Sequence, residues 1–170
     1  MTSGSGLSRR WFHFVPSPHA NGYGSGDQIM RISDVLRGKG SSVATVEPAT
    51  SVADLVASLA EHNVGALPVL EAGRLVGIVS ERDVVRRLHL GGAGLLQLTV
   101  ADIMSTNVTT CGPTDKIEDL ARIMTERRFR HMPVVENEAL IGIVSIGDLV
   151  KARIDALEAE REQLQSYIAG

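Results

Sequence analysis

The sequence has little of several residue types, and each shortage excludes a class of protein. Cys111 is the only cysteine among 170 residues, which excludes a disulfide framework and a cluster of thiolate metal ligands. No apolar run approaches the roughly 18 residues of a membrane-spanning helix, and the segment Trp11–Val15 is too short for a secretory signal. The net charge of −3 gives no reason to expect nucleic acid or an anionic membrane as a partner. We therefore expect a protein of the cytoplasm.

Aromatic residues are also scarce, at 4% of the chain, and they concentrate near the N-terminus. Residues 1–29 are rich in Gly, Ser and Pro and contain Trp11, Phe12, Phe14 and Tyr23. This composition favours a flexible leader or tag-like arm, with Met30 as the natural start of the folded part. The alternative is an arm whose aromatic side chains dock on the body or on a partner.

What the chain does contain is an internal repeat. A constant offset of 65 residues joins four pairs: Pro68 and Pro133, Gly77 and Gly142, Ser80 and Ser145, and Asp83 and Asp148. A repeat of this length carries one supersecondary unit. Because a unit of about 65 residues is marginally stable alone, we expect the two units to fold as one body.

Each unit begins with a predicted strand followed by a helix. The strands are residues 43–46 and 108–111. Both helices have apolar residues at i, i+3, i+4 and i+7, and their predicted N-caps are Ser51 and Thr114. These apolar stripes are most simply the faces that pack into the core.

Two short strands rich in Val and Ile then form a hairpin in each unit. A closing helix follows, beginning at Ser80 in the first unit and at Ser145 in the second. The segments 32–36 and 100–104 open the two units, and Gly91–Gly94 is the predicted linker between them. Each unit is therefore predicted to be strand–helix–strand–strand–helix.

The second closing helix is predicted to continue to the C-terminus. Its apolar residues form a heptad pattern that contains one arginine: Val150, Ile154, Leu157, Arg161, Leu164 and Ile168. So few heptads are marginal for an independent coiled coil. We therefore expect this helix to pack on its own body or on a second subunit.

These units resemble a tandem pair of cystathionine β-synthase (CBS) domains of the stand-alone bacterial type, an arrangement called a Bateman module. The resemblance rests on two matching sets of residues: Gly65–Val69, Leu75–Ser80 and Asp83, and Arg130–Val134, Leu140–Ser145 and Asp148. It implies an α/β (α+β) fold of two βαββα repeats, related by a pseudo-twofold axis, with two clefts between the repeats and a long C-terminal helix. The implied boundaries are 30–90 for repeat 1, 91–99 for the linker, 100–155 for repeat 2 and 156–170 for the helix extension.

The same resemblance implies a regulatory ligand that contains adenosine: AMP, ADP, ATP, S-adenosylmethionine or NAD(H). In CBS domains the aspartate accepts hydrogen bonds from the ribose hydroxyls, and the serine lies near the phosphate at a helix N-terminus. Judged by the residues alone, Ser80–Asp83 and Ser145–Asp148 are capping boxes, which satisfy free amides at a helix start. One residue can serve both roles.

The two clefts are expected to differ in charge. Arg130 and His131 precede a strand where CBS domains place side chains that reach a phosphate, and the arginine fork binds phosphate oxygens bidentately. We expect both residues beside Asp148, whereas Gly65–Ala66 occupy the corresponding positions beside Asp83. The sequence therefore predicts that Asp148 marks the stronger AMP site.

Other basic residues receive simpler interpretations. Arg127 and Arg128 are interpreted as a solvated helix end, and Arg82 is expected to point outward. Lys39 does not complete a P-loop, but it is a candidate for reaching a phosphate. By resemblance, the adenine in the Asp148 cleft would lie near Ala44, Val64 and Gly65, and the other cleft would combine Asp83 with Thr109, Phe129 and Arg130. The complete predicted ligand-binding set is Lys39, Ala44, Val64, Gly65, Ala66, Pro68, Ser80, Asp83, Thr109, Phe129, Arg130, His131, Pro133, Ser145 and Asp148.

No sequence feature supports catalysis. His62, His89 and His131 have no metal-ligand spacing, and no nucleophile–base pair is evident. We therefore predict a non-enzymatic regulatory module without a metal or catalytic cofactor, which binds an adenosine nucleotide, AMP foremost. We expect a homodimer with an unidentified protein target. The alternatives are an NAD(H)-binding CBS protein, a ligand-free dimeric scaffold and the regulatory subunit of a separate enzyme.

Overall fold

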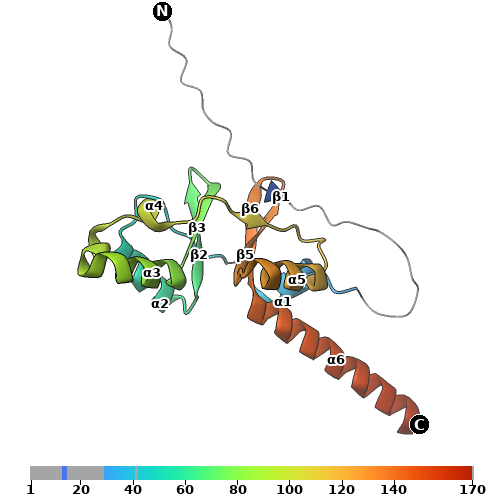
Figure 1. Ribbon diagram of the computed structural model, residues 1–170. Coiled ribbons are helices and arrows are strands. Elements are labelled where there is room, and N and C mark those ends of the chain that lie inside the picture. Colours follow the sequence, from blue (N-terminus) through green and yellow to red (C-terminus); the bar gives the residue numbers. More distant parts are fainter. Residues whose placement is uncertain (1–12, 15–28, 41, 170) are drawn as a thin grey trace, which may run out of the picture.

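Two antiparallel β-hairpins form the centre of the structure, one in each repeat (Figure 1). In the first hairpin β2 (Ala66–Glu71) pairs with β3 (Arg74–Ser80). In the second, β5 (His131–Glu136) pairs with β6 (Ala139–Ser145). These runs are rich in Val and Ile, which suit a pleated, half-buried strand. The computed structural model describes residues 13–14, 29–40 and 42–169.

Each hairpin closes through two residues with positive φ. They are Ala72 and Gly73 in the first hairpin, and Asn137 and Glu138 in the second. Two consecutive residues of this kind form the tight turn whose twist matches that of the flanking strands. β3 and β6 contact each other, so the two hairpins lie side by side and join the repeats into one body (Figure 1).

The first helix of each repeat carries the predicted apolar stripe. These helices are α2 (Val52–Glu61) and α5 (Ile117–Arg127). Ser51 caps α2 as predicted, because its Oγ accepts a hydrogen bond from the backbone N–H three residues on, at 3.0 Å. The prediction that Thr114 caps α5 is wrong. α5 begins at the same point of the repeat as α2 does, so its N-cap is Lys116. Lys116 makes no side-chain cap hydrogen bond.

The strand predicted at the start of each repeat is shorter than expected. In the first repeat it is a single parallel bridge between Val46 and Val69. In the second repeat it consists of β4 (Thr109–Thr110) and a parallel bridge from Cys111 to Val134. The remaining features agree with the predicted fold class, two βαββα units of mixed α/β structure.

The two segments that open the units pack on the opposite repeats. The sequence order predicts that each belongs to the unit it opens. Instead α1 (Ile32–Lys39) buries Ile32 completely in the core of the second repeat. In the same way α4 (Val100–Ile103) buries Val100 completely in the core of the first. The backbone N–H of Ile32 donates to the carbonyl of Asp115 at 3.0 Å, which ties α1 to the second repeat.

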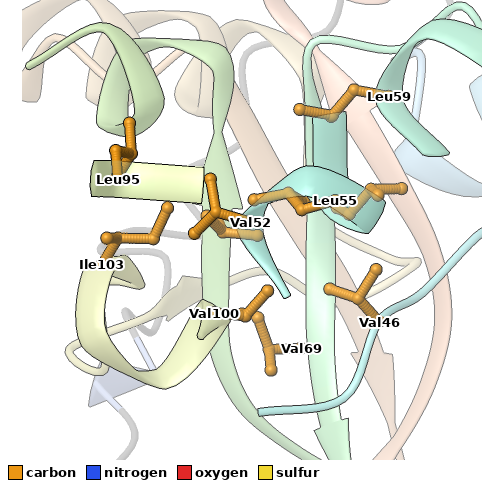
Figure 2. Packing of buried hydrophobic residues seen from close by; sticks show 10 residues of the cluster. Val46, Val52, Leu55, Leu59, Val69, Leu95, Val100 and Ile103 are labelled. Carbon is orange, nitrogen blue, oxygen red and sulfur yellow. The ribbon is translucent and has the colours of Figure 1, made fainter. Parts of the chain in front are cut away.

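The predicted linker is folded rather than free chain. The first closing helix, α3 (Glu81–Gly91), is followed directly by a 3-10 helix, η1 (Gly92–Gln97). Leu95 of η1 is only 2% exposed and belongs to the core of the first repeat. Figure 2 shows Leu95 in the same apolar cluster as Val52 and Leu55 of α2. The segment between the repeats therefore contributes to the core as well as to the connection.

The second closing helix, α6 (Ile146–Ala169), is the predicted long C-terminal helix. Figure 1 shows it extending away from the body. Its apolar residues Ile154, Leu157, Leu164 and Ile168 are all exposed in the single chain. Among the described residues, none of the helices combines the length and the apolar character needed to cross a membrane.

Of the predicted leader, residues 1–29, the structure describes only His13, Phe14 and Ile29. The expectations about its other residues, Trp11, Phe12 and Tyr23 included, lie outside the described part. The short strand β1 (His13–Phe14) pairs in parallel with β4, with Phe14 opposite Thr110.

Candidate functional site

A cleft of about 420 Å³ lies between the two repeats, within the size range of small-molecule sites. Its walls come from the junction of β3 and α3, from the segment that leads into β4, and from the connection between α5 and β5. The predicted residues that line it are Gly65, Ala66, Ser80, Asp83, Thr109, Phe129, Arg130, His131 and Pro133. The fold therefore gathers most of the predicted ligand-binding set into one cleft.

Asp83 is held in place by the capping box at the start of α3. Its Oδ2 accepts hydrogen bonds from the backbone N–H of Ser80 at 2.9 Å and from the Ser80 hydroxyl at 2.6 Å. Among the described residues, none donates a hydrogen bond to the other carboxylate oxygen, Oδ1. The cap thus orients a carboxylate in the cleft wall and leaves one oxygen available to accept hydrogen bonds from a ligand.

Five arginines line the same cleft, and the sequence interpretation missed four of them. Arg82 and Arg86 come from α3, whereas Arg127 and Arg128 come from the end of α5, just before Arg130. Arg82, Arg127 and Arg128 are exposed, as expected, and Arg127 and Arg128 stand at the end of α5, but all three also line the cleft, which the sequence interpretation did not foresee. Arg82 and Arg86 are separated by four residues and so lie on one face of α3, close to the capping serine Ser80; this spacing is the signal that could have identified them.

The predicted separation of Arg130 and His131 from Gly65 and Ala66 does not occur, whereas the predicted combination of Asp83 with Thr109, Phe129 and Arg130 does. Gly65, Ala66, Arg130 and His131 all line the cleft that contains Asp83. A Cβ atom on Gly65 would lie 3.1 Å from Cε1 of His131, so the absence of a side chain at position 65 lets the imidazole approach. The corresponding residues of the two repeats therefore line one cleft, in which Gly65 and His131 are close together.

His131 lies where charges from both repeats act on it. Burial lowers the pKa of the imidazole below its ordinary value of 6.5, and Lys39 and Arg130 lower the pKa further. Asp148 and Glu81 act in the opposite direction. The imidazole is accordingly neutral at pH 7 and can accept or donate a hydrogen bond through its ring nitrogens.

The second predicted aspartate, Asp148, is engaged by a side chain of the protein itself. Lys39 Nζ donates to Asp148 Oδ2 at 2.6 Å and to the carbonyl of Ile143 at 3.1 Å. Ser145 donates to the same oxygen from its backbone N–H at 2.7 Å and from its hydroxyl at 2.8 Å. Burial raises the pKa of Asp148, but the hydrogen bonds from Lys39 and Ser145 lower it below its ordinary value. The fold thus brings together Lys39, Ser145 and Asp148. Lys39 and Asp148 form an ion pair within the chain, and Ser145 donates hydrogen bonds to Asp148.

The three remaining predicted residues do not line the cleft at Asp83. Ala44 and Val64 pack against the core of the first repeat. Pro68 is buried in β2, and its carbonyl accepts a hydrogen bond from the backbone N–H of Val46 at 3.1 Å. In the part of the chain that the structure describes, no three His, Cys, Asp or Glu side chains converge to hold a metal ion.

Paired α/β repeats with a cleft between them define the class of this protein, a tandem repeat of the βαββα unit. The family model for the CBS domain matches it twice, at residues 32–90 and 100–155. The chain therefore belongs to the CBS-domain family and carries two CBS domains in tandem, as the sequence predicted.

Other proteins named for CBS domains are similar to this chain. The CBS domain-containing protein CBSX3, mitochondrial, from Arabidopsis thaliana is 37% identical over 157 residues, which cover 86% of this chain and 75% of that relative. The crystal structure of the CBS-domain containing protein ATU1752 from Agrobacterium tumefaciens matches with a TM-score of 0.71 and 43% identity, over 73% of this chain and 99% of that one. A crystal structure of CBSX2 in complex with AMP matches with a TM-score of 0.60 and 31% identity, over 74% and 96% of the two chains.

Proposed function

We propose that this chain is a non-enzymatic regulatory module that binds an adenosine nucleotide in the cleft at Asp83. One observation carries the proposal. A single cleft combines a carboxylate with an available oxygen, apolar wall residues and several arginines, and these are the groups that a ribose, a base and a phosphate require.

Each part of the nucleotide has a partner of suitable chemistry. Oδ1 of Asp83 can accept hydrogen bonds from the two ribose hydroxyls. Ile78, Val108 and Pro133 supply apolar surface for the flat base. Arg130 supplies a planar fork for phosphate oxygens. The AMP bound to CBSX2, a relative of 31% identity, supports this class of ligand.

A thermal-shift assay of the full chain tests the proposal with AMP, ATP, S-adenosylmethionine and NADH. A ligand that binds only the folded state at 100 times its Kd stabilises that state by about 2.7 kcal/mol, which raises the melting temperature by several degrees. A larger shift with NADH than with AMP or ATP would favour the alternative of an NAD(H)-binding protein. If none of the four compounds gives a dose-dependent shift, the ligand-free scaffold replaces this proposal.

A matched pair of variants locates the site. Asp83→Asn removes the charge and keeps an oxygen that can accept the hydrogen bond from the Ser80 backbone N–H in the capping box, and Asp148→Asn is the same change in the second repeat. We expect Asp83→Asn to abolish the nucleotide-induced shift and Asp148→Asn to retain it. The reverse result would locate the site at Asp148, which the sequence predicts to be the stronger of the two.

We also propose that the chain forms a homodimer through α6. Its exposed apolar residues follow the alternating spacing of a coiled-coil seam, and an apolar stripe of this kind is buried most simply against a second copy of itself. Sedimentation velocity should show a dimer for the wild-type chain and for Ala159→Lys, which lies off the seam, and a monomer for Leu157→Lys. A wild-type chain that stays monomeric at all micromolar concentrations would rule the dimer out.

The regulated target and the compartment remain sequence-based proposals. Without a catalytic site, the module would pass its ligand occupancy to another protein, either a separate enzyme or an unidentified partner. The expected compartment is the cytoplasm. The name of the Arabidopsis relative states that it is mitochondrial, so imaging of a tagged chain in its own cell is the direct test.

A further inference from the structure

The cleft at Asp83 carries more positive charge than a nucleoside monophosphate needs. Five arginine side chains line it, against the two carboxylates of Glu81 and Asp83, which leaves an excess of three positive charges. Within the described residues, none of these five arginines forms a salt bridge. Neighbouring like charges without partners repel one another, so the cleft is arranged for an anion of high charge.

The charge of the ligand distinguishes the candidates. A terminal phosphate monoester carries about −1.5 to −2 at pH 7, so AMP leaves part of the excess uncompensated. Each additional phosphate of ADP or ATP adds about one negative charge and more acceptor oxygens. Guanidinium groups bind such oxygens in charge-assisted, bidentate hydrogen bonds, which are stronger than neutral ones.

The shape of the cleft also provides room beyond the first phosphate. A second hollow of about 260 Å³ adjoins the cleft and shares Arg82, Arg128, Phe129 and Arg130 with it. A guanidinium nitrogen of Arg82 donates to the carbonyl of Arg128 at 3.4 Å, which places these two residues together at the border between the hollows. A phosphate chain that leaves the cleft on this side passes between arginines from α3 and from the end of α5.

We infer that the Asp83 cleft selects nucleotides with two or more phosphates over monophosphates, and that Arg82 and Arg128 are the residues that make the distinction. The inference rests on the proposed adenosine-nucleotide site and specifies its ligand class. Asp83 would hold the nucleoside whatever the number of phosphates, and the two arginines would contact only the outer ones.

Isothermal titration calorimetry of the full chain tests this inference with AMP, ADP and ATP, at about 0.15 M salt and with EDTA to remove divalent cations. At this ionic strength charges separated by more than about 8 Å are screened, so general attraction to a basic surface is weakened. We expect the Kd for ATP to be at least about tenfold lower than that for AMP, with ADP between them. Arg82→Gln and Arg128→Gln should each weaken ATP binding about tenfold and change AMP binding less than about threefold.

Arg122→Gln is the matched control. Arg122 lies on α5 and pairs with Asp119 at 3.2 Å, outside both hollows, so its replacement removes the same charge and should leave every Kd unchanged. AMP binding as tightly as ATP, or equal losses for the two ligands in Arg82→Gln and Arg128→Gln, would overturn the phosphate selection and leave the adenosine site standing. If AMP, ADP and ATP all fail to bind, the inference fails, and the proposed function fails with it when S-adenosylmethionine and NADH also leave the melting temperature unchanged.

Discussion

Replacement of Lys39 by methionine is expected to strengthen a second nucleotide site at Asp148. In the wild-type chain the lysine ammonium binds the carboxylate of Asp148 and the carbonyl of Ile143. Lys39 therefore binds the carboxylate that corresponds, in the second repeat, to that of Asp83 in the first. Methionine keeps most of the length of the side chain and removes the charge, so the variant tests the ion pair rather than the packing.

The size of the effect follows from the exposure of the pair. Hydrogen bonds to charged groups contribute about 1.5–3 kcal/mol when well buried, and exposed ion pairs contribute about 0.2–1 kcal/mol. The side chains of Lys39 and Asp148 are 40% and 25% exposed, so we expect this pair to stabilise the fold by about 1 kcal/mol. Lys39→Met should thus lower the melting temperature by about 2–4 °C. A ligand at Asp148 would no longer have to displace the lysine, which raises its affinity there about fivefold.

The affinity of the second site is the decisive measurement. Calorimetry with ATP should show one strong site in both chains and a second, weaker site whose Kd is about fivefold lower in Lys39→Met than in the wild-type chain. Lys151→Met is the control, because Lys151 pairs with Asp155 on the exposed surface of α6 and its replacement should change neither Kd. Two sites of similar affinity in the wild-type chain, or an unchanged Kd of the second site in Lys39→Met, would refute the reasoning.

The same ion pair predicts a dependence on pH. Because the hydrogen bonds from Lys39 and Ser145 hold the pKa of Asp148 below its ordinary 3.8, the pair stabilises the fold above about pH 4. This stabilisation is lost as the pH falls through the folded-state pKa. The melting temperatures of the wild-type chain and Lys39→Met should therefore converge in acid, and a constant difference down to about pH 2.5 would contradict this account.

Leu55→Ala should lower the free energy of unfolding by about 2–5 kcal/mol, because Leu55 is completely buried. Val56→Ala, at a 40% exposed position, should lower it by less than about 1 kcal/mol. Equal losses in urea denaturation would show that α2 turns another face to the core. Burial lowers the pKa of His131 in the folded chain, so the unfolded chain binds more protons below about pH 6.5 and the free energy of unfolding falls as the pH drops. His131→Gln should make the free energy of unfolding depend less on pH between about pH 7.5 and 5.5. An unchanged slope would show that other groups cause the pH dependence. Burial raises the pKa of Cys111 to about 12, so a thiol reagent at about pH 8 should react with Cys111 only after the protein unfolds. Rapid reaction of the native protein would show that the thiol lies outside the core.

Much of the fold could be predicted from the sequence because its signals are local. The period of the apolar residues gives α2 and α5, the Val- and Ile-rich runs give the hairpins, and the serine–aspartate pairs mark the starts of α3 and α6. The constant offset then identifies two copies of one unit. The error at Thr114 is of the same local kind, since a residue that often caps helices stands two positions before the true N-cap, Lys116.

The elements, the repeat and the residue types of a nucleotide site can thus be predicted from the order of the amino acids. Which of these residues meet depends on how the two repeats pack. Lys39 and Asp148 are 109 positions apart, and Arg82 and Arg128 are 46 apart, so neither contact leaves a periodic signal in the chain. Both arise because α1 and α4 pack on the opposite repeats and the two hairpins lie side by side. That packing places arginines of both repeats in the cleft at Asp83 and pairs Asp148 with Lys39.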